Sequence, residues 1–431
     1  MTPTTRIRRV ARFIVAAFAS FATASALGAQ QANPSVAAFG MSNNYTAAAV
    51  GFETIGWNSA LLAMPGQPKF SLGGLIFGSS AGIGPIGASD FADYSGKTIP
   101  TGVRQGWITQ VRAEGTQTGT VDGGATLLAL SWGNFAAQFS VAGGATMDMN
   151  GDALEMILLG NADAVAANRT LNPSGGLNGS GFATTAVSWS KALGWKPTGK
   201  AGESFAIGLT GKWVLGGGHV TARDNGSSVT ADNLSLRFPV VYGAGIDAGS
   251  GLGLDLSAAW RAGNTTLGLT VMNALNTFAW DASGFTCLNV TADITAAATN
   301  TNTGEVPCTT AAIKPTVSSI EALAFKPAIR AGFAWDAKKN WAFTGDVQAQ
   351  MGTEGEAILI GPKTSVGVGA EFRGIRFLPL RGGASVITGG TQFAAGAGLR
   401  IWGYELGVGA QMRTADGVSS TNLMFGLISI R

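Results

Sequence analysis

The 431-residue sequence has few charged residues and, after residue 29, no long hydrophobic run. Only 12% of its residues are Asp, Glu, Lys or Arg, which is about half the share typical of soluble domains. No uninterrupted apolar stretch reaches the roughly 18 residues that a membrane-spanning helix requires. A membrane protein of this composition must therefore cross the bilayer as β-strands.

Histidine and cysteine are also scarce. The single histidine, His219, lies in GGGHV without an HExxH, a GxSxG or a paired metal-ligand spacing, and we interpret it as a solvated loop residue. A barrel phospholipase using His219 is the weaker alternative, and we expect no enzyme activity, metal or cofactor. The two cysteines, Cys287 and Cys308, lie in one Thr-, Ala- and Asn-rich stretch without a CxxC spacing. This arrangement favours a disulfide in an oxidising compartment.

The first 29 residues have the pattern of an export signal. Arginines 6, 8, 9 and 12 precede an apolar core that ends in small residues near Ala29. A permanent membrane anchor is the weaker alternative because the core is short. Without these four arginines the net charge falls from +3 to about −1, which leaves no basic field for nucleic acid.

Glycine, in contrast, is abundant, with 64 residues, many of them within alternating segments. From Leu323 to Met412 the chain repeats segments of about ten residues in which every second side chain is apolar. Alternation alone fits a soluble sandwich or a membrane barrel. The export signal, the scarce charge and the missing helical span favour the barrel, with its apolar face toward lipid. Tryptophans near predicted strand ends, at 132, 335, 341 and 402, are typical of an interfacial girdle.

The alternation predicts fifteen strands. They cover residues 68–77, 124–132, 134–144, 181–193, 203–215, 233–248, 251–261, 264–281, 320–336, 340–351, 362–373, 375–387, 391–401, 402–413 and 420–430. A single-chain bacterial barrel has an even number, so either 264–281 splits near Asn273 or an early segment lies outside the wall. Helical pieces are expected over 102–114 and 151–167 in two long loops. The predicted fold is all-β: a single closed antiparallel transmembrane β-barrel over residues 68–431.

The predicted lumen face carries charges of both signs. They are Lys326, Arg330, Asp346, Glu371, Arg373, Arg381, Arg400, Glu405 and Arg413. Mixed signs favour a salt-bridged interior that braces the wall over a selectivity ring of one sign. Residues 30–67 precede the first strand and are too apolar for a tail and too short for a domain. We therefore expect this segment to be a plug inside the lumen.

Part of the plug resembles a known family. Residues 46–63 contain Trp57, Asn58, Ala60, Leu62 and Ala63 in a pattern similar to the WNPAGLA segment of the outer-membrane hydrophobe transporters related to the fatty acid channel FadL. The runs FLPLRGGAS, FAAGAGLRI and YELGVGA resemble the closing strands of that group. The resemblance implies about fourteen strands, with sixteen as the alternative, and a plug that acts as a hatch. Ser59, Leu61 and the terminal Ile430 and Arg431 depart from the family pattern.

These observations predict a bacterial outer-membrane channel for small hydrophobic molecules such as fatty acids, gated by the plug. The alternative is a non-transporting barrel that serves as a scaffold or assembly partner of surface or secretion machinery, and a porin for polar solutes ranks third. The expected partners are outer-membrane lipid, the barrel assembly machinery and a hydrophobic ligand. Neither the ligand nor the oligomeric state follows from the sequence.

Overall fold

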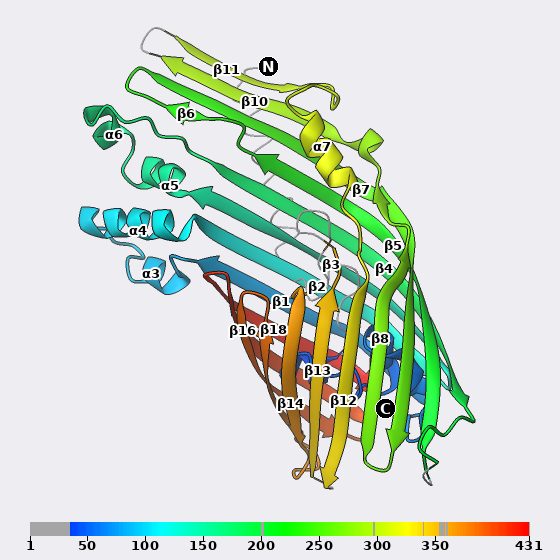
Figure 1. Cartoon of the computed structure of the whole chain (residues 1–431). Helices are drawn as coiled ribbons and strands as arrows, with labels where there is room; N and C mark the ends of the chain where they lie inside the picture. The colour runs from blue at the N-terminus through cyan, green and yellow to red at the C-terminus, as the bar shows by residue number, and fades with distance from the viewer. Residues whose placement is uncertain are drawn as a thin grey trace.

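Fourteen antiparallel strands form a closed wall. The structure is a computed structural model that describes residues 35–430 except 200–201, 296–297, 339, 353–357 and 359–360. In wall order the strands are β1 (Phe70–Gly84), β2 (Thr116–Trp132), β3 (Phe135–Asn150), β4 (Gly175–Leu193), β5 (Ser204–Arg223), β7 (Asn233–Ala262), β8 (Thr265–Asn276), β12 (Ala328–Lys338), β13 (Trp341–Gln350), β14 (Thr364–Phe372), β15 (Leu380–Ile387), β16 (Gly390–Ile401), β17 (Tyr404–Ala415) and β18 (Val418–Ile430). β18 pairs with β1 and closes the barrel (Figure 1). Within the described residues, no helix combines the length and hydropathy needed to cross a bilayer.

The predicted alternation gives the wall an apolar outer face. In β17 the side chains of Tyr404, Leu406, Val408 and Met412 are exposed, whereas Glu405 and Gln411 between them are buried. Because the exposed set is apolar and the buried set polar, the outer surface suits lipid. Trp132, Trp335, Trp341 and Trp402 are exposed beside the short turns, which we call the short-turn end.

The predicted count of fifteen strands was wrong because two predicted strands are one. Residues 233–248 and 251–261 both belong to the 30-residue strand β7. The Gly249–Ser250–Gly251 segment resembles a turn in sequence, but its residues pair with Gly216, Leu215 and Val214 of β5. Merging the two segments gives the even number that closure of this barrel requires.

A second correction concerns the predicted strand 320–336. Residues Lys314–Glu321 form helix α7, and β12 begins only at Ala328. Alternation from Leu323 would place Phe325 on the lipid-facing side, but the chain between α7 and β12 turns inward and Phe325 is buried. Lys326, predicted on the lumen face of this strand, precedes β12 and is half-buried, and no hydrogen bond or ion pair joins it to another described residue.

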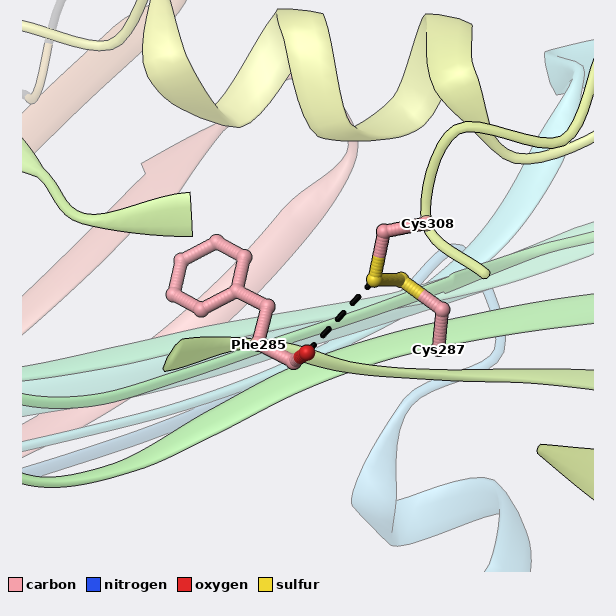
Figure 2. Close-up of a disulfide and its surroundings, with 3 residues drawn as sticks. All are labelled: Phe285, Cys287 and Cys308. Carbon is pink, nitrogen blue, oxygen red and sulfur yellow. Dashed lines mark hydrogen bonds between the residues drawn. A yellow bond between two sulfur atoms is a disulfide. The ribbon is translucent and has the colours of Figure 1, made fainter. Parts of the chain in front are cut away.

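At the end of the barrel opposite the short-turn end, which we call the long-loop end, several strands extend beyond their predicted lengths. The stretch 282–319, which lies between two predicted strands, contains β10 (Thr286–Thr295) and β11 (Thr299–Glu305), and β10 pairs with the start of β7. The short strands β6 (Ser228–Val229) and β9 (Ala279–Trp280) also pair with β7. A disulfide joins Cys287 and Cys308 at the base of the β10–β11 hairpin, next to Phe285 (Figure 2). The bridge fixes the hairpin to the chain that leads into α7.

Short helices cover part of this end. They are α3 (Ala88–Ala92), α4 (Thr101–Glu114), α5 (Gly151–Leu158) and α6 (Ala162–Ala166), so helices form within both predicted helical stretches. α4 and α5 pack through Trp107, Val111 and Leu154. Their polar sides meet where Arg112 pairs with Asp152 at 2.6 Å and with Glu155, which also binds Arg169.

This ion cluster predicts an acid-sensitive contact between α4 and α5. Burial alone would raise the pKa of Glu155, but hydrogen bonds from Arg169 and Arg112 outweigh it and lower the pKa. Burial would also raise the pKa of Asp152, but hydrogen bonds from the Asn172 amide and from Arg112 lower it. Carboxylates with lowered folded-state pKa values stabilise the fold above their unfolded pKa and lose that contribution as the pH falls through the folded value. We expect faster amide exchange in residues 101–114 and 151–158 below about pH 4. Hydrogen exchange at pH 7 and pH 3 measures this, after correction for the intrinsic rate. Unchanged protection at pH 3 would contradict it.

Candidate functional site

Residues 35–67, called the plug from here on, lie inside the barrel. Their helices are α2 (Val36–Gly40), η1 (Gly51–Gly56) and η2 (Ser59–Ala63). α2 contacts β15–β18, η1 contacts β1–β4, and η2 contacts β4, β5 and β7. Elements that touch strands around most of the circumference can do so only from the lumen, where Figure 1 shows this segment in blue.

Hydrogen bonds fix the plug to several sides of the wall. The Thr46 amide donates to Asp346 of β13 at 3.1 Å, and Gln411 of β17 donates to the Phe39 carbonyl at 2.7 Å. On the opposite side, Asn58 Nδ2 donates to the Ala258 carbonyl of β7 at 3.0 Å. The plug is therefore held by hydrogen bonds to strands β7, β13 and β17 as well as by packing.

Wall glycines explain how the plug backbone comes so close to the strands. A Cβ at Gly383 would lie 2.4 Å from the backbone of Met41, and one at Gly208 would lie 2.4 Å from the Ala60 amide nitrogen. Real Cβ atoms do not approach other atoms so closely. We call the wall glycines at which a Cβ would lie 3.0 Å or less from a plug atom the glycine cradle: Gly73, Gly208, Gly268, Gly332, Gly367, Gly369, Gly383, Gly396, Gly407, Gly409 and Gly426. The high glycine content thus serves, in part, the fit between wall and plug.

The plug residues that carry the family resemblance are mostly buried. Trp57 packs edge-on against Tyr45 with ring centroids 6.0 Å apart, and the Arg330 guanidinium lies 4.7 Å from its ring centroid. Asn58 caps η2 by accepting a hydrogen bond from the Ala60 amide. Ala60 and Leu62 are buried, and Ala63 is half-buried. This motif therefore shapes the plug and its contact with the wall.

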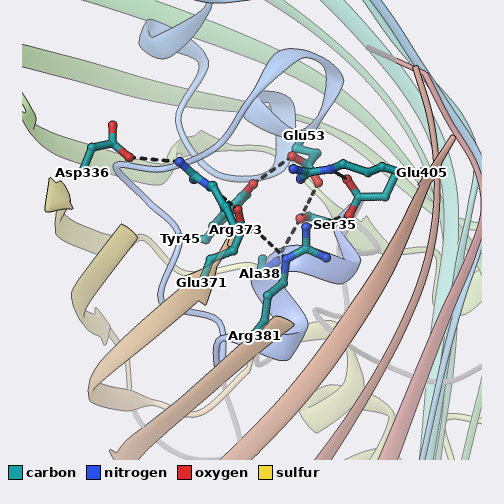
Figure 3. Close-up of polar contacts among 10 residues, drawn as sticks. Ser35, Ala38, Tyr45, Glu53, Asp336, Glu371, Arg373, Arg381 and Glu405 are labelled. Carbon is teal, nitrogen blue, oxygen red and sulfur yellow. Dashed lines mark hydrogen bonds and ion pairs between the residues drawn. The ribbon is translucent and has the colours of Figure 1, made fainter. Parts of the chain in front are cut away.

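Five of the predicted lumen charges form one network beside the plug (Figure 3). The fully buried Arg381 side chain donates to Glu371 at 2.7 Å and to Glu405 at 2.6 Å. Arg400 also binds Glu405 at 2.8 Å, and Arg373 binds both Glu371 and Asp336. The Cβ of Arg381 lies 3.2 Å from the position a Cβ would take at Gly40 of the plug. The network braces strands β14–β17 where α2 rests on them.

The other predicted charges lie elsewhere. Arg330 donates to Gln348 at 2.6 Å and interacts electrostatically with Asp346. Arg413 interacts with Asp122 of β2. A buried pair that we did not predict joins Lys212 to Asp255 at 2.5 Å, and Lys212 also donates to Asn273. The sequence alone could have placed Lys212 on the lumen face, because it alternates along β5 with Leu209 and Trp213, which are exposed on the outer face.

An aromatic cluster lies in the lumen toward the long loops. It consists of Phe182, His219, Phe278, Trp280, Phe285 and Phe325 and is called the lumen aromatic cluster. Phe182 of β4 and Phe325 before β12 have ring centroids 5.2 Å apart, although β5, β7 and β8 separate their strands in the wall. With strands about 4.8 Å apart, these rings can meet only across the interior.

His219 belongs to this cluster and is not the solvated loop residue that the sequence predicted. It is only 4% exposed. Phe182 and Gly181 of β4 pair with Gly216 and Gly218 of β5, so Gly217 has no partner on β4 and is an extra residue in β5. An extra residue reverses the alternation beyond it, which places His219 on the lumen side with Val214 and Gly216.

Along β5 the site has three layers. Ala206 and Gly208 contact the plug, Lys212 holds its ion pair, and Val214 to His219 contribute to the aromatic cluster and its surroundings. Since β5 runs from the short-turn end toward the long loops, the aromatic cluster lies outside the plug. On the side of the plug that faces the short-turn end, there is a pocket of about 880 Å³. It is lined by plug residues Met41, Tyr45 and Val50 and by Arg373, Arg376, Arg400 and Trp402. The plug thus separates an outer aromatic layer from an inner pocket.

The described residues hold no group of three or more His, Cys, Asp or Glu side chains that could bind a metal ion.

The fold matches that of known channels. The Pseudomonas putida toluene transporter TodX aligns over 94% of this chain and 99% of its own, with 10% identity and a TM-score of 0.52. A TodX variant described as a monoaromatic hydrocarbon channel aligns over 93% and 99%, with 10% identity and a TM-score of 0.53. The Ralstonia pickettii toluene transporter TbuX has 12% identity, covers 94% and 99%, and has a TM-score of 0.47. No protein-family model and no curated protein matches the sequence. The predicted FadL-like barrel fold is confirmed.

Proposed function

We propose that this protein is an outer-membrane channel for small hydrophobic molecules, with the plug as its gate. The main observation is the order of the layers in the lumen: an aromatic cluster toward the long loops, then the plug, then an inner pocket. The fold, which matches structures described as toluene transporters, supports the outer-membrane location and the transport role.

The aromatic cluster supports a hydrophobic cargo. Phe182, Phe278 and Phe325 offer apolar ring faces inside the barrel, and apolar molecules gain free energy on leaving water for such surfaces. A polar solute would gain no comparable contact there. The mixed charges near the plug are paired with one another, so they hold the wall and plug and do not select ions.

A structural barrel without transport is the second candidate. The observation that favours it is the number of sides on which the plug is fixed, by hydrogen bonds to β7, β13 and β17 and by the glycine cradle. In this case the plug is a permanent stopper and the outer surface or loops carry the function.

Uptake measurements separate the two functions. Purified protein in liposomes is expected to admit labelled toluene or a labelled fatty acid faster than empty liposomes, whereas uptake of a labelled sugar remains at background. Deleting residues 31–66 is expected to raise uptake of both the apolar solute and the sugar, since it removes the barrier. Apolar uptake that is the same with and without residues 31–66 would contradict the gate, and background uptake of the apolar solutes by the wild type would favour the structural barrel. Heat-modifiable migration in detergent shows that each protein is folded.

A further inference from the structure

We infer that the lumen aromatic cluster binds an apolar molecule that carries one oxygen function, a hydroxyl or a carbonyl, in preference to a pure hydrocarbon. The inference rests on the proposed transport function and specifies its cargo. It comes from two nitrogen atoms in the cluster whose hydrogen-bonding capacity is unused.

The first atom is Nδ1 of His219. The other ring nitrogen, Nε2, lies 2.7 Å from Thr221 Oγ1, whereas Nδ1 is buried and has no hydrogen-bond partner among the described residues. The His219 ring is enclosed by Trp280, at a centroid distance of 5.1 Å, and by Phe285, at 6.3 Å and nearly parallel. A polar atom in such surroundings is costly unless it finds a partner.

The second atom is Nε1 of Trp280. Its N–H is also buried without a partner among the described residues, and the Trp280 side chain, like that of His219, is 4% exposed. Buried tryptophans usually pair this N–H. The position of Trp280 is set by the pairing of its backbone with Gly249 of β7 and by the contact of its indole ring with Gly216. Two neighbouring rings of one cluster thus each present an unpaired nitrogen.

The two nitrogens match the hydrogen-bonding groups of a single oxygen function. A ligand hydroxyl accepts a hydrogen bond from the Trp280 N–H and donates its own proton to Nδ1 when His219 is protonated on Nε2. If the proton is on Nδ1, both nitrogens are donors and a carbonyl oxygen accepts from both. The remaining cluster members, Phe182, Phe278 and Phe325, contact the hydrocarbon part. Because the rings are closely packed, the ligand enters by displacing one of them.

The test compares two ligands of nearly equal size, p-cresol and p-xylene, which differ by a hydroxyl in place of a methyl group. Equilibrium dialysis of labelled ligand against the folded full-length protein in detergent gives both dissociation constants. The variants are His219→Phe and Trp280→Phe, each of which keeps an aromatic ring and removes a hydrogen-bonding nitrogen. Phe285→Leu is the matched control, since it changes the same cluster without changing its polar atoms. Comparing each variant with the wild type cancels the different hydration of the two ligands.

We expect the preference for p-cresol over p-xylene to fall about tenfold in His219→Phe and in Trp280→Phe, and to remain in Phe285→Leu. If both ligands bind and the preference is the same in all four proteins, the inference is overturned while the hydrophobic channel stands. If neither ligand binds the folded wild type, the inference and its basis in the proposed function both fail. Heat-modifiable migration shows whether each variant is folded. If only one of His219→Phe and Trp280→Phe folds, its comparison with the wild type still tests the inference.

Discussion

Replacing Gly383 with valine is expected to open the proposed channel. Gly383 faces the lumen in β15, and a Cβ there would lie 2.4 Å from the carbonyl carbon and oxygen of Met41. Both are backbone atoms, so the plug cannot yield by rotating a side chain. Overpacking of this kind costs about 1–3 kcal/mol, and moving the plug away from β15 relieves it. Single-channel conductance in planar bilayers is expected to be near zero for the wild type, and to become measurable in this variant and approach that of the protein lacking residues 31–66.

The adjacent glycine provides the control. Gly382 lies on the other face of the same strand, and the nearest atom to a Cβ there is the Ala394 carbonyl oxygen at 3.9 Å. Gly382→Val therefore adds the same side chain to the same strand without touching the plug, and should conduct like the wild type. Equal conductance of the two valine variants would contradict the glycine cradle as the feature that seats the plug.

Replacing Arg381 with methionine is expected to cause the largest loss of stability. The Arg381 side chain is completely buried and binds both Glu371 and Glu405. Methionine retains much of the side-chain volume but leaves two buried carboxylates without their shared partner. Removing one member of a buried ion network costs about 3–5 kcal/mol. Urea unfolding of the barrel in detergent, followed by the heat-modifiable band, measures the loss.

A triple variant separates the charge from the packing. Adding Glu371→Gln and Glu405→Gln to Arg381→Met removes the two carboxylates that have lost their bonds to Arg381, while Arg373 and Arg400 remain accessible to solvent. We expect the triple variant to recover most of the lost free energy of unfolding. If the single variant is as stable as the wild type, the network does not brace the wall. If the triple variant is no better than the single one, packing and not charge explains the loss.

The residues of the lumen network could be predicted, but their partners could not. Alternation along β14–β17 placed Glu371, Arg381 and Glu405 on one face, because the side-chain period of a strand is two residues and is local. Which carboxylate each arginine binds depends on the register between strands. The pairs Glu371↔Arg381 and Arg400↔Glu405 lie directly opposite each other in the ladder, and no local pattern specifies this.

Where a strand departs from regular geometry, local patterns failed. A bulge at Gly217 places His219 in the lumen and not in the predicted solvent. Pairing of Gly249, Ser250 and Gly251 with β5 joins two predicted strands into one, and helix α7 displaces the start of β12 so that Phe325 turns inward. In each case the neighbouring strand or the packing of the lumen decided the outcome.

The sequence by itself determined the wall: its strand class, its apolar outer face and a polar lumen with charges of both signs. These follow from short-range alternation and composition, which each segment carries independently. The tertiary structure alone decided how the lumen is filled. The contact of Gln411 with Phe39 and the approach of Gly383 to Met41 join residues more than three hundred positions apart. Such contacts form only when the barrel closes around the plug, because closure brings strands from the whole length of the chain to face one interior.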